Sequence, residues 1–537
     1  MLDLLKNMGF TDWVTMILVP ALLTFVVNLV YNLFFHPLAK VPGPFLARAT
    51  GIVSWYYALS GRRHLWIWQQ FQIYGYRVRI HPNAVVFCDP ESYTDIYSTK
   101  SNVRRSKFYT AWRRNDRDRT TLNSIDVAEH AHRRKLLNVS FTEKSLRAAT
   151  GFIIKHVDRW HALLVDESGS DWSAPVDFAE TVDTLVFDIM GDLCFGRSFN
   201  IKEPGENPLK VVPHNIAKYT QFQNPLARSP FLDFIVWLQP RGLEQILEVV
   251  TPPAVKQYFK FVHDSVTDRI TLQAEQAQKP ESERRQDMFY FLFEARDPDT
   301  GLPAYKETDI RAEANLLIIA GSDTTAISLT GIIFYLTGNP RPYEKLVKEI
   351  RTTFASVEDI VHGPKLLGCQ YLKACIDEGM RLTPVVPSEL SREVLPGGIT
   401  IKGEYYPPGT IVGSANWASS RNPDVYPDAD VFRPERWIVD EAAGVTKADV
   451  ALVRSNFHPF ASGPGNCVGK NLAMTELMIT LARTLHRMDV RREPGSTEGA
   501  GAPELGWGAR DDKQFHLYDA YISLRHGPRV QFRKRTA

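Results

Sequence analysis

A glycine-rich loop with a single cysteine near the C-terminus constrains the fold of this chain more than any other sequence feature. It reads Phe460-Ala-Ser-Gly-Pro-Gly-Asn-Cys467-Val-Gly469 and precedes an apolar stretch from 472 to 485. Glycine adopts backbone conformations that other residues avoid, and it lets the chain approach a flat ligand closely. A cysteine thiolate in such a loop can ligate a metal, and thiolate is one of the axial ligands of haem iron. The alternative is a buried structural cysteine.

The composition bounds the class of protein and its surroundings. Lys and Arg total 63 while Asp and Glu total 61, so the overall charge does not indicate a nucleic-acid partner. The five cysteines are odd in number and widely spaced, which does not fit a disulfide framework and favours a reducing compartment. No Cys-x-x-Cys or His-x-x-x-His pair suggests a zinc site.

One stretch, Val14 to Phe35, is predicted to span a membrane. It carries no charge and as a helix would cover roughly 30 Å, about the thickness of one hydrocarbon core. The alternatives are a secretory signal, which needs a basic start and a cleavage site not found here, and a buried helix. Basic residues follow the span, which predicts a cytoplasmic body. We therefore expect a membrane anchor in residues 1–36, a proline-rich hinge in 37–44 and one globular domain in 45–537.

The globular part has mostly helical periodicity and a few short strands. Apolar residues recur at helical spacing from Gly61 to Tyr74 and from Phe141 to Leu164. Prolines and aromatic residues between Pro204 and Pro253 predict a broken helical region. Strands are expected at 76–80, 84–88, 400–401, 521–524 and 529–532.

Two motifs ahead of the cysteine loop carry paired charges. Glu378 and Arg381 share one face of a helix that Pro384 ends. The segment Phe432-Arg-Pro-Glu-Arg436-Trp follows further along the chain. Alone, the first motif could be an exposed ion pair that contributes less than about 1 kcal/mol.

A long apolar helix is predicted from Thr308, its expected N-cap, to Gly338. Within it lies the polar run Ala320-Gly-Ser-Asp323-Thr324-Thr, which is a poor helix former. Thr324 can return its hydroxyl to the carbonyl of Ala320 and distort the helix. The alternative is a polar turn on a surface helix, but apolar residues all round predict a central helix.

These motifs, together and in this order, resemble the cytochrome P450 family. Phe460, Gly463, Cys467 and Gly469 fall on the positions of the family's haem-binding loop, Phe-x-x-Gly-x-Arg-x-Cys-x-Gly. Gly465 stands where the family has Arg or His to contact a haem propionate. The resemblance implies that Cys467 is the axial iron ligand of haem b, iron protoporphyrin IX.

The resemblance also implies roles for the other motifs. Glu378, Arg381 and Arg436 would form a buried triad behind the haem. The polar run resembles the family's oxygen-binding groove, in which Thr324 would hold a water at the oxygen site and Asp323 would relay protons from solvent.

The haem propionates need cationic partners, because Gly465 offers none. The run Glu129-His130-Ala-His-Arg-Arg134-Lys resembles the family helix Trp-x-x-x-Arg, with His130 in place of Trp. His130 and Arg134 are therefore candidate propionate ligands, and Arg392 is another by its family position. A cationic run is otherwise a solvated face.

The fold implied is mainly α with a smaller β region, and the reaction implied is monooxygenation. RH and O2 would react with electrons from NADPH-cytochrome P450 reductase, because the chain has no flavin or NAD fingerprint of its own. A cationic face around Lys470 and Arg134 would dock that partner. The sequence in and around the motifs is similar to filamentous-fungal microsomal members of the family, which implies an endoplasmic-reticulum location. Many such members act in secondary metabolism.

Two alternatives remain open at this stage. The first is an isomerase, dehydratase or peroxide-using enzyme of the same fold, and such enzymes often lack the acid–alcohol pair. The second is a membrane haem protein without catalysis.

The substrate is expected to be a lipophilic or aromatic small molecule, because two of the predicted pocket segments, the helix before Gly321 and 385–390, are mostly apolar. Glu389 or Arg228 could recognise a polar group, with an ordinary surface role as the alternative. The segments are 100–128, 205–255, the helix before Gly321, and 385–390.

Overall fold

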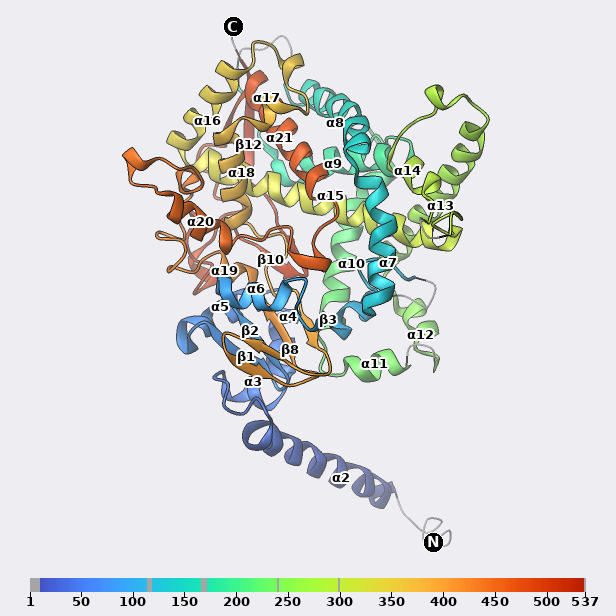
Figure 1. Ribbon diagram of the computed structural model, residues 1–537, viewed down its shortest axis with the longest axis vertical. Coiled ribbons are helices and arrows are strands. Elements are labelled where there is room, and N and C mark those ends of the chain that lie inside the picture. Colours follow the sequence, from blue (N-terminus) through green and yellow to red (C-terminus); the bar gives the residue numbers. More distant parts are fainter. Residues whose placement is uncertain (1–9, 114–117, 166–170, 239–240, 298–299, 536–537) are drawn as a thin grey trace.

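The computed structural model describes residues 10–113, 118–165, 171–238, 241–297 and 300–535 (Figure 1). Helices dominate, as predicted, and several begin at a side-chain cap: Asp126, Thr142 and Asp177 accept hydrogen bonds from backbone N–H groups in the first turns of α7, α8 and α9. The helices are α2 (Phe10–Val30), α3 (Phe45–Ala49), α4 (Ile52–Leu59), α5 (Arg63–Tyr74), α6 (Pro90–Tyr97), α7 (Val127–Leu137), α8 (Glu143–Leu164), α9 (Phe178–Phe195), α10 (Val212–Ala227), α11 (Leu232–Leu238), α12 (Leu243–Val250), α13 (Pro253–Ala277), α14 (Met288–Glu294), α15 (Glu307–Gly338), α16 (Pro340–Thr353), α17 (Pro364–Leu367), α18 (Gln370–Leu382), α19 (Asn416–Ser419), α20 (Lys447–Ser455) and α21 (Lys470–Arg487).

The N-terminal helix α2 projects from the body and leads into a π-helical turn, Tyr31–Phe35 (Figure 1). The stretch Val14–Phe35 has a mean hydropathy of 2.2 and is not buried against the body. A helix this long and apolar could be a membrane anchor.

The proline-rich segment after α2 packs against the body. Leu38 and Val41 are buried in a hydrophobic cluster with residues of the sheet. Gly43 lies so close to strand β1 that a Cβ there would overlap the carbonyl oxygen of Arg79. This close packing fixes the segment to the sheet, and a hinge role for it stays a prediction.

The principal sheet has five strands in the order β1-β2-β8-β5-β3. Of its pairings only β2 with β8 is parallel, and the others are antiparallel. The sequence predicted β1 and β2 to within one residue and missed the other three. The strands are β1 (Arg77–His81), β2 (Ala84–Phe87), β3 (Val103–Arg105), β5 (Arg392–Val394) and β8 (Ile411–Ser414).

The remaining strands form three small sheets. β12 pairs with both β4 and β9, β10 pairs with β11, and β6 pairs with β7. The strands predicted at 400–401, 521–524 and 529–532 are present here with shifted ends. These elements are β4 (Val176–Asp177), β6 (Ile399–Ile401), β7 (Glu404–Tyr406), β9 (Met488–Arg492), β10 (Tyr518–Ala520), β11 (Ile522–Leu524) and β12 (Arg529–Lys534).

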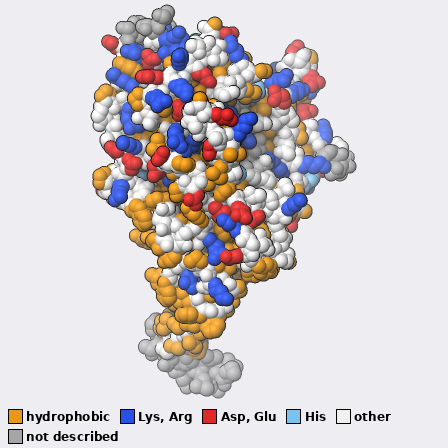
Figure 2. Space-filling model, turned by 60° about the vertical axis from the view of Figure 1, so that its left-hand side comes forward, with side chains coloured by type: hydrophobic (Ala, Val, Ile, Leu, Met, Phe, Trp, Pro, Cys, Tyr) orange, Lys and Arg blue, Asp and Glu red, His pale blue; other side chains and the backbone are white. Residues whose placement is uncertain are grey.

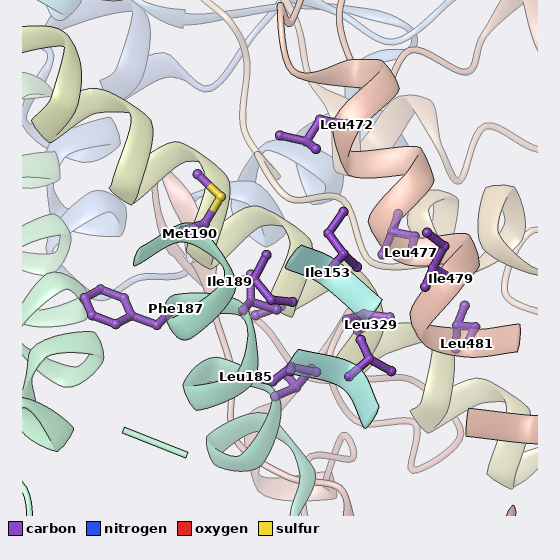
Figure 3. Packing of buried hydrophobic residues seen from close by; sticks show 14 of the residues in the cluster. Ile153, Leu185, Phe187, Ile189, Met190, Leu329, Leu472, Leu477, Ile479 and Leu481 are labelled. Carbon is purple, nitrogen blue, oxygen red and sulfur yellow. The ribbon is translucent and has the colours of Figure 1, made fainter. Parts of the chain in front are cut away.

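Helix α15 runs through the main hydrophobic core, as its apolar surround predicted. It is long and apolar enough to cross a membrane, but 72% of its most apolar window is buried inside the protein, so it is a core helix. Gly321 lets α9 approach, since a Cβ there would overlap the side chain of Met190. Figure 3 shows α8, α9, α15 and α21 contributing to one cluster, with Leu185 of α9 beside Leu329 of α15.

Candidate active site

The cysteine loop is a tight turn that leads directly into α21. Its middle, Gly463–Gly465, forms a single 3-10 turn, and the backbone N–H of Cys467 donates to the carbonyl of Phe460 over 2.8 Å. Gly463 has a φ of +63°, and a Cβ there would overlap the carbonyl oxygen of Tyr97 in α6. Glycine is therefore required at this position for two separate reasons.

The thiol of Cys467 lies at the N-terminal end of α21. Burial raises its pKa, while the backbone N–H groups of Gly469 and Lys470 and the charge of Arg134 act in the opposite direction. These donors all favour the thiolate, as does the positive end of a helix dipole. The arrangement suits a cysteine that serves as a metal ligand.

Exposed side chains on buried elements mark a space that the protein does not fill. Cys467 is exposed although burial raises its pKa. On the central helix α15, Ala320 is exposed and Leu316 and Thr324 are half-buried, one turn apart, while most of the helix is buried. Such positions fit a ligand that is lodged in the interior.

The predicted triad residues meet around one carboxylate. Arg381 donates to both oxygens of Glu378 over 2.8 and 2.9 Å, and Arg436 Nε donates over 3.0 Å. The indole of Trp437 and the backbone N–H of Arg433 also donate to Glu378, over 2.9 Å each. Burial opposes the ionised form, but the two arginines outweigh it and lower the pKa of Glu378. The sequence did not single out Trp437.

The polar run in α15 has the local geometry expected from its sequence. Thr324 Oγ1 donates to the carbonyl oxygen of Ala320 over 2.6 Å. Asp323 is buried, and its Oδ2 has no hydrogen-bond partner within the described residues. Burial, with a further contribution from Asp183, raises the pKa of Asp323 to about 7.

A second buried carboxyl lies beside this run, on α21. Burial raises the pKa of Glu476 to about 8, although a hydrogen bond with the side chain of Thr325 opposes the rise. The sequence analysis did not identify Glu476.

Cationic side chains gather beside the cysteine loop. Arg134 donates to the side-chain oxygen of Asn466 over 2.7 Å, and also to its carbonyl oxygen, which ties α7 to the loop. Arg392 lies against Gly465, where an added Cβ would be 2.8 Å from Nη2 of Arg392 and 3.9 Å from Nη2 of Arg105. A side chain at 465 would therefore have to displace the guanidinium of Arg392 and would contact that of Arg105.

This cluster has no anionic partner of its own. Among the described residues, neither Arg105, Arg134 nor Arg392 forms an ion pair with a carboxylate. Burial, together with the charges of the three arginines, lowers the pKa of His130 to about 3, so His130 is neutral. Arg392 is buried and Arg105 and Arg134 are half-buried. Cations withdrawn from water need an anionic ligand, and the two propionates of haem would supply one. The sequence analysis missed Arg105 because it lies on the unpredicted strand β3.

Glu389 and Arg228 are neither surface residues nor free to bind a ligand. Glu389 is buried and accepts two hydrogen bonds from Arg63, over 2.6 and 3.0 Å, and it pairs with Arg228 as well. The surface role considered from the sequence is wrong, because three distant segments meet there.

The predicted pocket segments meet in a separate apolar cluster. It joins Phe108 and Tyr109 to Ile327 of α15 and to Val385. Tyr521, at the tip of the β10–β11 hairpin, was not predicted there. It has a φ of +73°, a conformation that non-glycine residues rarely adopt, and it packs against Phe108 and Trp112.

Comparisons with known proteins agree with this geometry. Residues 42–501 match the family model described as Cytochrome P450. The chain is 32% identical to cytochrome P450 monooxygenase apf7 of Gibberella fujikuroi, over 94% of this chain and 95% of that protein. It is 33% identical to cytochrome P450 monooxygenase fscF of Fusarium equiseti, over 94% and 93%, and 32% identical to cytochrome P450 monooxygenase AKT7 of Alternaria alternata, over 94% of each.

A fold of this kind, with a cysteine loop leading into α21 and a polar run on the buried helix α15, defines a haem-thiolate protein. The chain belongs to the cytochrome P450 family. The haem that this family carries fits the residues present: a thiol at a helix N-terminus, an exposed stripe on α15 and a cationic cluster without a carboxylate.

Proposed function

We propose that this protein is a monooxygenase that inserts one oxygen atom from O2 into a lipophilic or aromatic small molecule. The observation that carries the proposal is the acid–alcohol pair Asp323–Thr324 on α15, in a protein whose cysteine loop is built for a thiolate. An isomerase or peroxide-using enzyme of the same fold has no need of that pair. A haem protein without catalysis does not need it either.

Cys467 would hold the haem iron, and the cationic cluster would hold the propionates. Haem b is proposed because the sequence has no Cys-x-x-Cys-His motif for covalent attachment. When bound, the haem supplies the redox chemistry that activates O2. Arg105, Arg134 and Arg392 supply charge-assisted hydrogen bonds to the propionates.

Thr324 and Asp323 would handle the protons that the reaction consumes. The hydroxyl of Thr324 is fixed by its bond to Ala320 and can hold a water at the oxygen site. A carboxyl with a pKa of about 7 is present in both protonation states near neutral pH. Asp323 can therefore give a proton toward Thr324 and take one back.

The substrate is proposed from the apolar cluster around Phe108, Tyr109 and Trp112. Aromatic walls favour a flat or aromatic molecule. The carboxylate of Glu389 is already paired with both Arg63 and Arg228, so it is not available to a substrate. Fungal relatives of this chain support a place in secondary-metabolite biosynthesis.

Electrons are proposed to come from NADPH-cytochrome P450 reductase. The chain has no nucleotide fingerprint, so a separate protein must deliver them. Lys470 and Arg134, beside the cysteine loop, would contribute to the docking face.

We also propose that the protein lies on the cytoplasmic face of the endoplasmic reticulum. A second apolar surface supports a membrane location: Phe45 and Leu46 of α3, Tyr56 of α4, and Phe234 and Trp237 of α11 are each more than half exposed. Figure 2 shows apolar side chains over the end of the molecule that carries α2. Deleting residues 1–35 should preserve the haem spectrum but leave residual membrane binding through this surface. Loss of haem from well-folded truncated protein would contradict a simple anchor role.

The test of the proposed function is reconstitution of the purified protein with the reductase, NADPH and isotopically labelled O2. We expect an extract of candidate substrates to yield a product that carries one labelled oxygen atom, with the label depending on NADPH. A product that forms without NADPH or reductase would favour the isomerase or peroxide-using alternative.

A further inference from the structure

The position of Asp323 raises the question of how solvent protons reach it. Its Oδ2 is buried and unpartnered within the described residues, and α15 is covered by α9 on one side. The monooxygenase reaction converts RH, O2, two electrons and two protons into ROH and H2O. Each turnover must therefore draw protons from solvent to the centre of the protein.

A partly exposed ion pair interacts electrostatically with Asp323. Asp183 of α9 pairs with Arg525, which follows strand β11. The side chain of Arg525 is 5% exposed and that of Asp183 is 24% exposed. Burial raises the pKa of Asp183, while Arg525 opposes this. Asp183 is therefore hard to ionise, and yet about a quarter of its side chain is open to solvent.

Polar atoms continue from this pair in both directions. Inward, Arg525 Nε is buried without a partner in the described part of the chain, as is Asp323 Oδ2, so each can bind a water molecule. Outward, Glu180 lies one turn before Asp183 on α9. Burial raises the pKa of Glu180, and the negative charges of Asp177 and Asp183 raise it further. Carboxyls thus run along one face of the start of α9 toward α15.

We infer that Asp183 and Arg525 form the solvent end of the proton path to Asp323. Asp323 gives a proton toward Thr324 and becomes a carboxylate. It takes a proton back through water held at Asp183 and Arg525, and that water recovers one from bulk solvent. Both residues would act through Asp323, so both are positioning residues. The inference rests on the proposed function, because only an oxygen-reducing reaction needs this supply.

The same groups set the charge state of Asp323. Burial is the largest cause of the raised pKa of Asp323. The charge of Asp183 raises this pKa further, and the charge of Arg525 lowers it. Glu476 of α21 is a further titratable group in this region, and it is hydrogen-bonded to Thr325, two residues from Asp323. Replacing Asp183 by Asn removes a negative charge and leaves Arg525 unpaired, and both changes favour the Asp323 carboxylate.

The first experiment follows the protonated carboxyl of Asp323 by infrared spectroscopy of the haem-loaded protein. The band is assigned by its loss in Asp323→Asn. We expect Asp183→Asn to lower the pH midpoint of this band by about one unit, and Asp183→Glu to restore it. The double variant Asp183→Asn with Arg525→Leu leaves no unpaired charge, so it should fold even if the single variant does not. It should lower the midpoint by less, because Asp183 has the larger effect.

The second experiment measures product formed per NADPH in H2O and D2O. Asp183→Asn should reduce product formation about tenfold and enlarge the solvent isotope effect, with haem content and substrate-induced spectral change unaltered. The matched control is Glu203→Gln, which breaks the surface pair with Arg159. It should behave as wild type.

The two experiments separate the inference from the function on which it rests. An unchanged infrared midpoint and an unchanged isotope effect in folded, haem-loaded Asp183→Asn would overturn the proton path. A wild type that makes no product with NADPH and reductase would overturn the proposed function. The infrared titration would still report whether Asp183 and Asp323 are coupled.

Discussion

The two sides of the proposed haem site treat buried charge in opposite ways. On the cysteine side, which comprises the loop and the triad behind it, Glu378 receives hydrogen bonds on both oxygens from two arginines, an indole and a backbone N–H. On the α15 side, Asp323 has an oxygen without a partner among the described residues and a pKa of about 7. The difference shows where the protein must stay unchanged during turnover and where a group must gain and lose protons.

The largest effect is expected at Cys467. Cys467→Ala removes the thiolate, so the reduced carbon-monoxide complex should lose its thiolate-type spectrum and product formation should stop. Cys369→Ala, at a buried cysteine elsewhere, is the control and should keep the spectrum. An unchanged spectrum in Cys467→Ala would show that the ligand lies elsewhere.

The next effect is on stability and belongs to the triad. Glu378→Gln leaves Arg381 and Arg436 as buried cations without their carboxylate, which should lower the free energy of unfolding by roughly 3–5 kcal/mol. Denaturant unfolding of the haem-loaded protein measures this. Glu143→Gln, which breaks the exposed pair with Arg147, should change little.

The triad also makes a prediction about pH. The pKa of Glu378 in the folded protein is lowered from its ordinary value of 4.5. Its stabilising effect is therefore complete above pH 4.5 and is lost as the pH falls through the folded pKa. The difference in stability between wild type and Glu378→Gln should shrink in that direction. A constant difference down to low pH would mean that the carboxylate is not the stabilising species.

The sequence predicted the cysteine side better than the rest of the site. Its residues lie in short continuous motifs whose chemistry is local, so Glu378, Arg381 and Arg436 could be named from spacing and resemblance. Arg105 and Tyr521 could not. Arg105 ends the three-residue strand β3, and Tyr521 lies between the three-residue strands β10 and β11. A strand this short is defined by its partner rather than by its own pattern. The partner of Arg105 is Arg392, which lies far along the chain.

Helix ends show the same limit on a smaller scale. Thr308 was expected to cap α15, but the helix begins at Glu307, and Asp309 accepts a hydrogen bond from the backbone N–H of Lys306. The predicted cap is wrong, because Lys306 takes the N-cap position. The role of Asp183 could not be predicted from the sequence for a different reason. Only the packing of α9 on α15 brings Asp183 near Asp323.

On the α15 side, Thr324→Ala should separate electron consumption from product formation. Without the hydroxyl, proton delivery at the oxygen site should fail and electrons should leave as hydrogen peroxide. Product per NADPH should fall at least about tenfold, while the haem spectrum and the substrate-induced shift remain. The control is Thr337→Ala in the same helix, whose hydroxyl bonds to Ile333 in the same way. If Thr324→Ala formed as much product per NADPH as the wild type, Thr324 would have no role in proton delivery. The α15 side would then not differ from the cysteine side in this way.

The smallest effect concerns Gly465, which lies on the cysteine side but departs from the family's haem loop. One possible outcome is that Gly465→Arg supplies a propionate ligand that the protein otherwise lacks. Transfer of haem from this variant to apomyoglobin would then be slower than from wild type. The geometry gives the opposite expectation. The new side chain would enter space held by Arg392 and place a third positive charge beside Arg105. Haem loss should be faster, by a few fold.

Variants of Arg105 and Arg392, the neighbours of Gly465, test the same expectation. Arg105→Gln should speed haem loss about tenfold, because it removes a charge-assisted hydrogen bond from the cluster. Adding Gly465→Arg to Arg392→Gln should recover part of the loss, since the vacated space can then take the new guanidinium. If Gly465→Arg alone tightens haem, Arg105 and Arg392 do not replace the missing side chain. Gly465 would then weaken haem binding, and the cysteine side would not hold the propionates as firmly as it holds the buried charge of Glu378.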